Sequence, residues 1–316
     1  MASTIQTEHD TILIAANPRA GSRSRARHLA ELGEWLEARS LRVEMVSELD
    51  VAERRASELF EQRRLRALVG AGGDGTLAEL VNRTVPGTPL AIYPSGTANL
   101  VARYIGVTTR CEEFGQMLLD RHTVELDAGR ANGRLFLAVC SCGFDAEVVR
   151  RVHAARSGHI SKFAYALPIL SAVWGYRFPE LRIEVNAGSP DATSLAARWA
   201  FVSNLPCYAG GLKPGIGADG TDGQLDLCAL SRGGLLSATR YLPHVFLGSQ
   251  ARLADCTIRR AQKFRIDSAA EVPYELDGDP GGVLPVEIEV VPRRLSLIVP
   301  RESQILSDPP CPGTLQ

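Results

Sequence analysis

The chain has 316 residues, with 35 basic and 36 acidic side chains that leave a formal net charge of -1. This balance excludes a globally basic nucleic-acid-binding protein, so any anionic partner must be met by a local group of residues. Hydrophobic residues make up 45% of the chain, enough to fill one large core or two smaller ones.

The cysteines and the amino terminus favour a cytoplasmic location. The seven cysteines are odd in number and show no CxxC pair or metal-ligand spacing, so we expect free thiols in a reducing cytosol. The first ten residues lack the apolar core of a signal peptide, and no stretch reaches the roughly 20 apolar residues of a membrane-spanning helix. We therefore expect a cytoplasmic protein that can associate peripherally with a membrane.

Strands and helices alternate along residues 8–124. Apolar strands are predicted at 11–16, 41–46, 67–70 and 89–93, and helices at 26–38, 51–64 and 77–83. Such alternation is typical of a parallel sheet covered by helices, and these sheets bind ligands at the carboxyl ends of their strands. The loops that follow the strands are therefore the first candidates for a site.

The pattern changes after residue 124. Short alternating runs occur at 134–140, 181–185, 197–203, 224–230, 255–266 and 286–299. They predict a mostly antiparallel β-sandwich domain over 125–302, which follows an α/β domain over 8–124 and precedes a flexible tail at 303–316. The apolar segment 160–176 breaks the pattern. It is either a buried core helix or a wall or lid against an acyl chain.

The strongest local signal is Gly72-Gly73-Asp74-Gly75-Thr76, where a strand meets a helix. Glycines there let the main chain approach a ligand closely, so that amide groups near a helix amino terminus can bind phosphate. A carboxylate in such a loop repels phosphate unless it contacts a divalent cation or a hydroxyl group. Asp74 is therefore a candidate for either contact, and the alternative is that it caps the helix that it begins.

Two further loops follow neighbouring strands. Asn17-Pro18-Arg19-Ala20-Gly21 comes after the first strand, and Ser95-Gly96-Thr97-Ala98-Asn99 comes after the fourth. The first is followed by Arg23, Arg25 and Arg27, which either pair with phosphate groups or form a solvated helix face. Because parallel strands end at one edge of a sheet, the three loops are expected to converge.

The loops and later motifs resemble the bacterial diacylglycerol kinase-like lipid kinases, which share their catalytic domain with sphingosine and ceramide kinases. In order, the motifs are NPRAG (17–21), GGDGTLAELVN (72–82), PSGTAN (94–99), GFDAEV (143–148), SNLPCYAGG (203–211), ADGTDGQLDL (218–227) and LDGDP (276–280). GGDGT alone is shared with NAD kinases and is echoed in phosphofructokinases. The full series in this order is specific and covers nearly the whole chain.

The resemblance implies that ATP and Mg²⁺ are the cofactors. It assigns nucleotide binding to Asn17, Pro18, Arg19, Gly21, Ser47, Gly72, Gly73, Asp74, Gly75, Thr76, Thr97 and Asn99. It also implies a structural magnesium ion at Asp219, Asp222 and Gln224. Carboxylate and carbonyl oxygens in a Gly-containing turn suit a hard cation, although an ordinary hairpin turn has the same composition.

The turn Asp277-Gly278-Asp279 matches a family motif that usually reads Asp-Gly-Glu. The resemblance implies that one of its carboxylates accepts the proton of the attacking hydroxyl. Asp279 is one methylene shorter than the family's Glu, so three catalytic candidates stay open: Asp279, Asp277 and Asp74. Asp145, in the GFDA motif, resembles a residue that joins the same acidic network.

The implied function is transfer of the γ-phosphate of ATP to a hydroxyl of a lipid at a membrane surface, with diacylglycerol or a related glycerolipid or sphingolipid as acceptor. Nucleic acid is not an expected partner, and a homodimer stays open. The alternatives are an NAD kinase, which shares GGDGT, and a non-catalytic lipid-binding protein with the same fold. The GTAN, GFDA and DGD motifs count against the first, and the retained Asp74, Asp222 and Asp277 count against the second.

Overall fold

The computed structural model describes residues 8–16, 23–96, 98–154, 175–206, 208, 211–303 and 305. These residues group into two compact units. Unit 1 takes the described residues of Met1–Leu126 and Arg293–Pro310, and unit 2 takes those of Asp127–Pro292. Five predicted nucleotide-binding residues lie outside the described part of the chain, namely Asn17, Pro18, Arg19, Gly21 and Thr97, and so does 160–174 of the apolar segment.

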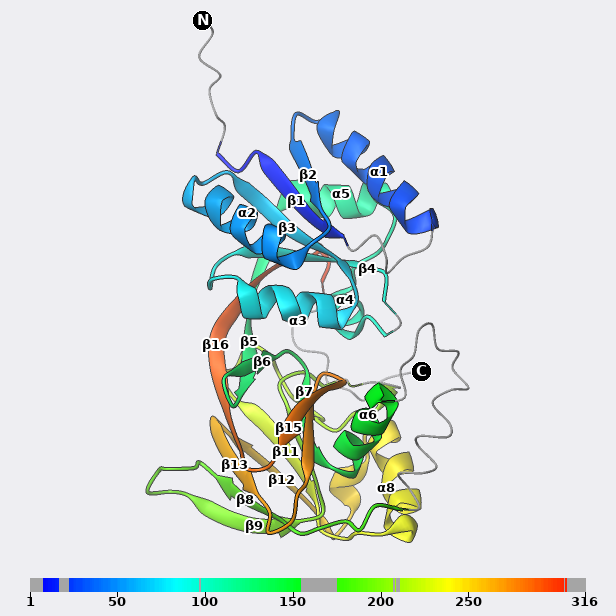
Figure 1. Ribbon diagram of the computed structural model, residues 1–316, viewed down its shortest axis with the longest axis vertical. Helices are drawn as coiled ribbons and strands as arrows, with labels where there is room; N and C mark the ends of the chain where they lie inside the picture. The colour runs from blue at the N-terminus through cyan, green and yellow to red at the C-terminus, as the bar shows by residue number, and fades with distance from the viewer. Residues whose placement is uncertain are drawn as a thin grey trace, which may run out of the picture. The chain divides into compact units, whose positions relative to one another are not determined.

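Unit 1 is built on a parallel sheet with the strand order β2-β1-β3-β4 (Figure 1). The strands are β1 (Thr11–Ala16), β2 (Arg42–Val46), β3 (Leu65–Gly72) and β4 (Pro89–Pro94). β1, β3 and β4 are buried almost throughout, which explains why their sequences are continuous apolar runs instead of alternating ones. The predicted α/β fold is confirmed.

Helices cover both faces of this sheet. On one face α1 (Arg23–Glu37) and α5 (Cys111–Asp120) pack with the strands in a core that contains Leu32, Phe114 and Ile14. On the other face lie α2 (Leu49–Glu61) and α3 (Asp74–Arg83), as Figure 1 shows. The short α4 (Leu100–Ile105) follows β4.

The boundary between the two units differs from the predicted domain boundary because of two long strands. β5 (Thr123–Ala131) pairs with β16 (Val286–Ile298), and the end of β16 pairs in parallel with β4 through Ser296 and Leu297. Residues 293–302, which the sequence assigns to the second domain, therefore group with unit 1. Ser303, assigned to the flexible tail, is buried, and its hydroxyl donates to the Ile105 carbonyl at 2.8 Å.

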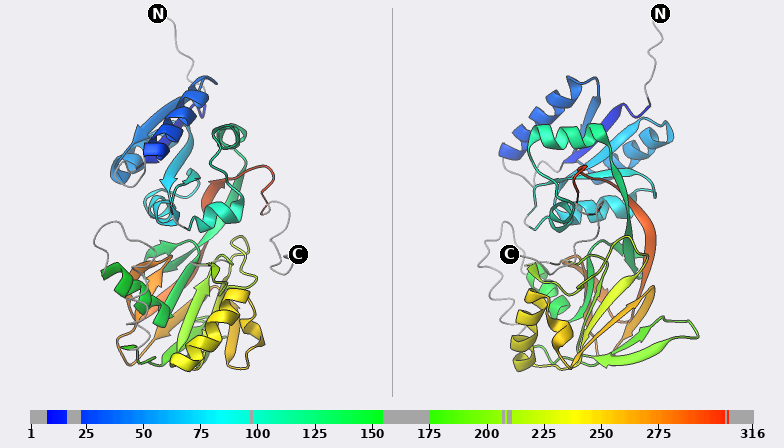
Figure 2. Two further views of the ribbon diagram at one scale, coloured as in Figure 1. Left: turned by 90° about the vertical axis from the view of Figure 1, so that its right-hand side faces the viewer. Right: turned by 180° about the vertical axis from the view of Figure 1, so that it is seen from behind.

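Unit 2 stacks two antiparallel sheets, as the predicted β-sandwich requires (Figure 2). One sheet has the order β12-β11-β10-β7-β14-β15, and the other contains β16-β13-β8-β9. Their shared core includes Phe136, Val202, Phe264 and Ile288. The strands are β6 (Arg134–Phe136), β7 (Val139–Gly143), β8 (Leu181–Val185), β9 (Thr193–Ala197), β10 (Trp199–Ser203), β11 (Leu225–Leu230), β12 (Cys256–Ala261), β13 (Lys263–Asp267), β14 (Pro273–Leu276) and β15 (Asp279–Val283).

Four helices of the described chain lie outside the predicted helix ranges: α4, α5, α6 (Phe144–Ala154) and α8 (Leu235–Leu247). α8 contains Pro243 and carries apolar residues on its exposed side as well as its buried side, so its sequence lacks the polar face that marks a surface helix. A 3-10 turn, η4 (Gln250–Arg252), follows it. None of the helices in the described residues combines the length and the apolar character needed to span a bilayer.

Candidate active site

The two described glycine-rich loops of unit 1 lie against each other. β3 pairs with β4 up to Gly72 and Pro94, and the Ser95 amide donates to the Gly72 carbonyl at 2.9 Å. α3 begins immediately after Gly73, whose carbonyl accepts from Thr76 N at 3.0 Å. The GGDGT and SGTAN loops therefore meet at one sheet edge. Ser47, an exposed residue directly after β2, lies at the same edge of the sheet.

Close packing of the main chain explains the glycines of these loops. A Cβ atom on Gly96 would lie 2.6 Å from Gly73 Cα and 2.9 Å from Asn99 Oδ1. A Cβ on Gly72 would lie 2.0 Å from Thr76 Oγ1. No side chain fits at Gly72 or Gly96. The main chain of Gly75 and Gly96 is exposed. The loops thus present main chain to solvent, which is the arrangement that phosphate-binding loops use.

Asn99 shapes its own loop. Its backbone is left-handed, with φ 49°, and its side-chain amide both accepts from Gly96 N and donates to Gly96 O, each at 2.9 Å. Arg25 of α1 reaches the same loop, since Nη1 donates to Ser95 Oγ at 3.2 Å. An arginine of the predicted cluster is therefore next to the SGTAN loop.

Asp74 caps a helix, but a different one from the helix that it begins. Its Oδ1 accepts from the Val101 amide, in the first turn of α4, at 2.9 Å. Asn99, the residue in the usual capping position of α4, makes no such bond because its side chain is bonded to Gly96. Asp74 therefore fixes α4 to the GGDGT loop.

In unit 2, Asp277 is held by the backbone. It has φ 53°, and its carboxylate accepts three amide hydrogen bonds, from Leu137 at 2.6 Å, Ala138 at 2.8 Å and Val139 at 3.0 Å. Its own amide donates to Val139 O. This bonding fixes the turn between β14 and β15 against the start of β7.

Asp279 has very different surroundings. It is the first residue of β15, and its side chain is 42% exposed. Arg134 lies beside it, with Nη2 3.8 Å from Asp279 Oδ2 and its own side chain 39% exposed. An ion pair so long and so exposed contributes little to stability. The turn thus fixes one aspartate and presents the other to solvent.

A buried acidic cluster lies behind this turn, formed by Asp145, which the resemblance implied, and by Glu275, which the sequence analysis missed. Glu275 of β14 is 0% exposed, and its carboxyl accepts from Ser141 N at 3.2 Å and Gly278 N at 2.6 Å. Asp145, at the start of α6, accepts from Ser141 Oγ at 2.8 Å and from Tyr208 Oη at 3.1 Å. Glu275 lies in β14, two residues before Asp277, and this position was its one signal in the sequence.

Burial and mutual repulsion shift the pKa values in this cluster. Burial, and then the neighbouring Asp145, raise the pKa of Glu275 well above its usual range. Burial also raises the pKa of Asp145, while Ser141 and Tyr208 oppose that shift. Burial and the Asp145 charge raise the pKa of Tyr208. The cluster therefore favours retaining protons behind the Asp277 turn.

The Asp-rich turn between β10 and β11 contains the three predicted metal ligands, Asp219, Asp222 and Gln224. Asp222 Oδ1 accepts from Gln224 N at 2.9 Å, and Asp219 Oδ1 accepts from Thr221 N at 3.0 Å. Asp127 of β5, missed in the sequence, joins them because its Oδ2 accepts from Gly223 N at 2.7 Å.

The charges of this turn fit a cation. Burial, with contributions from Asp219 and Asp127, raises the pKa of Asp222, and Arg260 partly offsets this through an ion pair at 3.2 Å. Carboxylates that repel one another are suitable donors for a hard cation. Among the described residues, however, no three His, Cys, Asp or Glu side chains stand as a complete ligand set.

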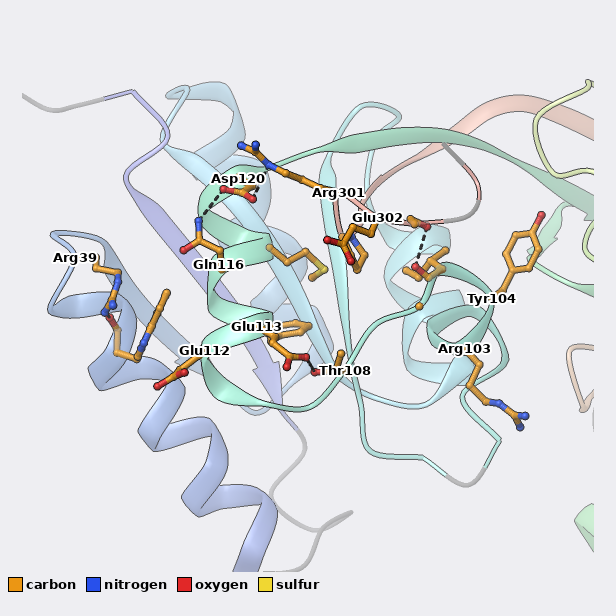
Figure 3. A pocket seen from close by; sticks show the side chains of 17 residues that line it. Arg39, Arg103, Tyr104, Thr108, Glu112, Glu113, Gln116, Asp120, Arg301 and Glu302 are labelled. Carbon is orange, nitrogen blue, oxygen red and sulfur yellow. Dashed lines mark hydrogen bonds and ion pairs between the residues drawn. The ribbon is translucent and has the colours of Figure 1, made fainter. Parts of the chain in front are cut away.

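A separate pocket of about 960 Å³ lies in unit 1, between α1, α5, the end of α4 and residues 300–303 (Figure 3). Side chains on its wall bond to one another: Asp120 pairs with Arg301 at 2.8 Å and accepts from Gln116. None of the predicted nucleotide-binding residues that the structure describes lines it.

Comparison with known proteins identifies relatives of this chain. The family model of the diacylglycerol kinase catalytic domain matches residues 11–131, and that of the YegS C-terminal NAD kinase beta sandwich-like domain matches residues 138–299, just over half of the chain. A diacylglycerol kinase of Mycobacterium tuberculosis is 29% identical over 243 residues, which are 74% of this chain and 77% of that one. A diacylglycerol kinase of Bacillus subtilis is 24% identical over 298 residues, which are 92% and 96% of the two chains.

Solved structures show the same fold. A diacylglycerol kinase structure from Bacillus anthracis superposes with a TM-score of 0.65 at 21% identity, over 93% of this chain and 98% of that one. Yeast NADH kinase complexed with NADH gives a TM-score of 0.51 at 12% identity, over 92% and 83%. The fold is thus of the two-domain type that diacylglycerol kinases share with NADH kinase. Within that class, the chain belongs to the bacterial diacylglycerol kinase-like family.

Proposed function

We propose that the protein transfers the γ-phosphate of ATP to a hydroxyl group of a lipid, with diacylglycerol as the first candidate acceptor. The observation that carries the proposal is the pair of interlocked glycine loops at the ends of β3 and β4, where Gly72 and Gly96 leave no room for a side chain. Relatives named diacylglycerol kinase over most of their length support the choice of acceptor.

In the proposed reaction, unit 1 binds ATP and unit 2 accepts the proton. Main-chain amides of the 72–76 and 95–99 loops bind the phosphates, with Ser47 and the Asn17–Gly21 and Thr97 positions as further nucleotide contacts. The lipid hydroxyl oxygen attacks the γ-phosphorus, the bond to the β-phosphate oxygen breaks, and ADP leaves. Asp279 takes the hydroxyl proton, because its side chain is 42% exposed whereas three backbone amides already bind the carboxylate of Asp277.

Asp277 and Asp74 have supporting positions in this proposal. Asp277 holds the turn in place through its three amide bonds, which leaves Asp279 free to meet the substrate. Asp74 anchors α4 to the phosphate loop through Val101. A Mg²⁺ ion, when bound, would neutralise phosphate charge during transfer. We assign a second, structural ion to Asp219, Asp222 and Gln224, with Asp127 as an additional oxygen donor beside them.

The likeness to yeast NADH kinase makes a dinucleotide the second candidate acceptor. The test is transfer of labelled γ-phosphate from ATP, with magnesium, to diacylglycerol, ceramide, a sphingoid base and NAD in parallel, the lipids being supplied in mixed micelles. Labelled phosphatidic acid is the expected product. Labelled NADP would establish the dinucleotide instead, and labelling of no acceptor would contradict a kinase function.

A further inference from the structure

The helix α8 exposes an apolar face that nothing in the described part of unit 2 covers. Leu236 is 86% exposed, Leu247 is 70%, Phe246 is 54% and Leu242 is 43%. We call these four side chains the α8 apolar face. Among the described residues, the other large hydrophobic side chains of comparable exposure stand singly, at Met45, Val85 and Val283.

The exposed large apolar residues of α8 lie on one side of the helix. At 100° per residue, the exposed positions 236, 239, 240, 242, 243, 246 and 247 fall within one arc. The opposite side carries the buried Ala238, Tyr241 and Val245. Tyr241 fastens that side to the sandwich, because its hydroxyl donates to Asp255 Oδ2 at 2.7 Å and its ring meets Trp199 edge-on. The apolar face is therefore not needed to hold α8 in place.

Basic residues lie within and on either side of α8 in the sequence. Residues 231–254 contain three arginines, Arg232, Arg240 and Arg252, and no Asp or Glu. The next residue, Asp255, is mostly buried and pairs with both Arg232 at 3.2 Å and Arg240 at 2.8 Å. The guanidinium-bearing side chains stay 70% and 43% exposed, respectively. One carboxylate is thus shared between two arginines, and the surface keeps a net positive charge.

We propose that the α8 apolar face docks on the surface of an anionic phospholipid bilayer. Leucine and phenylalanine side chains enter the boundary between headgroups and acyl chains, while the surrounding arginines meet lipid phosphates. A second copy of the chain suits the face less well, because facing α8 helices would bring like-charged arginines together. The inference rests on the proposed function, since a lipid kinase must reach an acceptor that lies in a bilayer.

The experiment is cosedimentation of the full chain with phosphatidylcholine vesicles that contain phosphatidylglycerol, without ATP. The double substitution Leu236→Gln/Leu247→Gln should weaken vesicle binding about tenfold or more, because it removes two large buried apolar side chains from the interface. Met45→Gln/Val85→Gln is the matched control, with exposed apolar residues in unit 1, and should bind as the wild type does. Equal binding by wild type and the α8 variant, or no binding by either, would overturn the proposal.

A separate variant tests the contribution of positive charge to vesicle binding. Arg252→Gln leaves the apolar face intact and should weaken binding to the anionic vesicles about fivefold, since one arginine near an anionic surface contributes on that order. Its binding to pure phosphatidylcholine vesicles should match that of the wild type. Wild-type protein that binds neutral and anionic vesicles equally would overturn the anionic preference.

Two further readouts separate the rival outcomes. In sedimentation velocity, a wild-type dimer that Leu236→Gln/Leu247→Gln converts to monomer, with vesicle binding unchanged, would identify the face as a contact between copies and overturn the proposal. In kinase assays, the α8 variant should keep wild-type activity on a water-soluble short-chain diacylglycerol and lose activity on vesicles. If the wild type binds vesicles and the α8 variant does not, but the wild type phosphorylates no lipid, the proposed function is refuted. The docking surface is then still supported.

Discussion

The phosphate loops of unit 1 and the acidic turn of unit 2 are built in opposite ways. At the ends of β3 and β4, the surface is main chain, and side chains such as Asn99 and Asp74 serve to hold the loops. Around the β14–β15 turn, side-chain carboxylates dominate, with Glu275 buried, Asp277 held by three amides and Asp279 exposed. The first arrangement suits binding of an anion, and the second suits acceptance of a proton.

The contrast teaches that neighbouring aspartates of one motif can have separate tasks. Asp277 and Asp279 are two residues apart, yet one accepts three backbone hydrogen bonds and the other lies beside a long ion pair with Arg134. A carboxylate that is already saturated by amides is a poor proton acceptor, because protonation would break those bonds. The structure therefore favours Asp279 for the chemistry and Asp277 for the geometry.

The largest effect is expected for Asp279→Asn, which removes the proton acceptor. Phosphate transfer should fall about 10²- to 10⁴-fold, the range typical for loss of a general base. Asp279→Glu should recover much of the rate. Asp267→Asn, another exposed acid of unit 2 beside an arginine, is the control and should keep wild-type activity. An Asp279→Asn enzyme with wild-type turnover would exclude Asp279 as the base.

Gly96→Ala should damage unit 1 next most strongly. The added methyl group must displace Gly73, because the two loops leave only 2.6 Å. Overpacking of this kind costs about 1–3 kcal/mol, so ATP should bind about 10- to 100-fold more weakly in equilibrium dialysis. Gly33→Ala in α1 is the control: its methyl group would be 3.5 Å from Met45 Cε, an ordinary contact. If Gly96→Ala bound ATP normally, the loops would not be the phosphate site.

Asp74 allows capping to be separated from charge. Asp74→Ala removes the acceptor of the Val101 amide and should lower the free energy of unfolding by about 0.5–2 kcal/mol in urea denaturation. Asp74→Asn keeps an oxygen at that position and should lose less stability. If both variants lose phosphate transfer but only Asp74→Ala loses stability, then the charge itself is needed for the reaction. Equal stability of the two variants would contradict the capping role.

The smallest effect concerns Glu275 and pH. Because the folded protein raises the pKa of Glu275, its contribution to stability is present at low pH and declines as pH rises above the unfolded value of about 4.3. Glu275→Gln has no proton to lose. The unfolding free energy of the wild type minus that of the variant should therefore decrease between about pH 5 and about pH 7.5. A difference that stays constant over this range would show that Glu275 is not perturbed.

Much of the fold could be predicted from the sequence, for identifiable reasons. The buried parallel strands of unit 1 are short apolar runs followed by glycine loops, so both the strands and the order of the motifs could be read directly. The end of β16 was assigned to the wrong unit because pairing of Ser296 with β4 is a long-range contact without a local signal. α8 was missed because its exposed side is apolar, so that the sequence shows no polar helix face, and because it contains Pro243.

The candidate site was predictable at the level of motifs and not of contacts. GGDGT and DGD named Asp74, Asp277 and Asp279, but the sequence could not show that Asp74 bonds to Val101 or that Asp277 is bonded to 137–139. Glu275 and Asp127 went unnoticed because each lies within a strand and outside the recognised motifs. Their importance depends on which backbone amides and carboxylates the fold brings beside them.

The most direct test of the division between the two units is the ATP affinity of Asp279→Asn, measured by isothermal titration. If unit 1 binds the nucleotide and Asp279 only accepts the proton, this variant will bind ATP as tightly as the wild type while phosphate transfer is lost. An ATP affinity that falls in parallel with the transfer rate would contradict the account, because Asp279 would then belong to the nucleotide site.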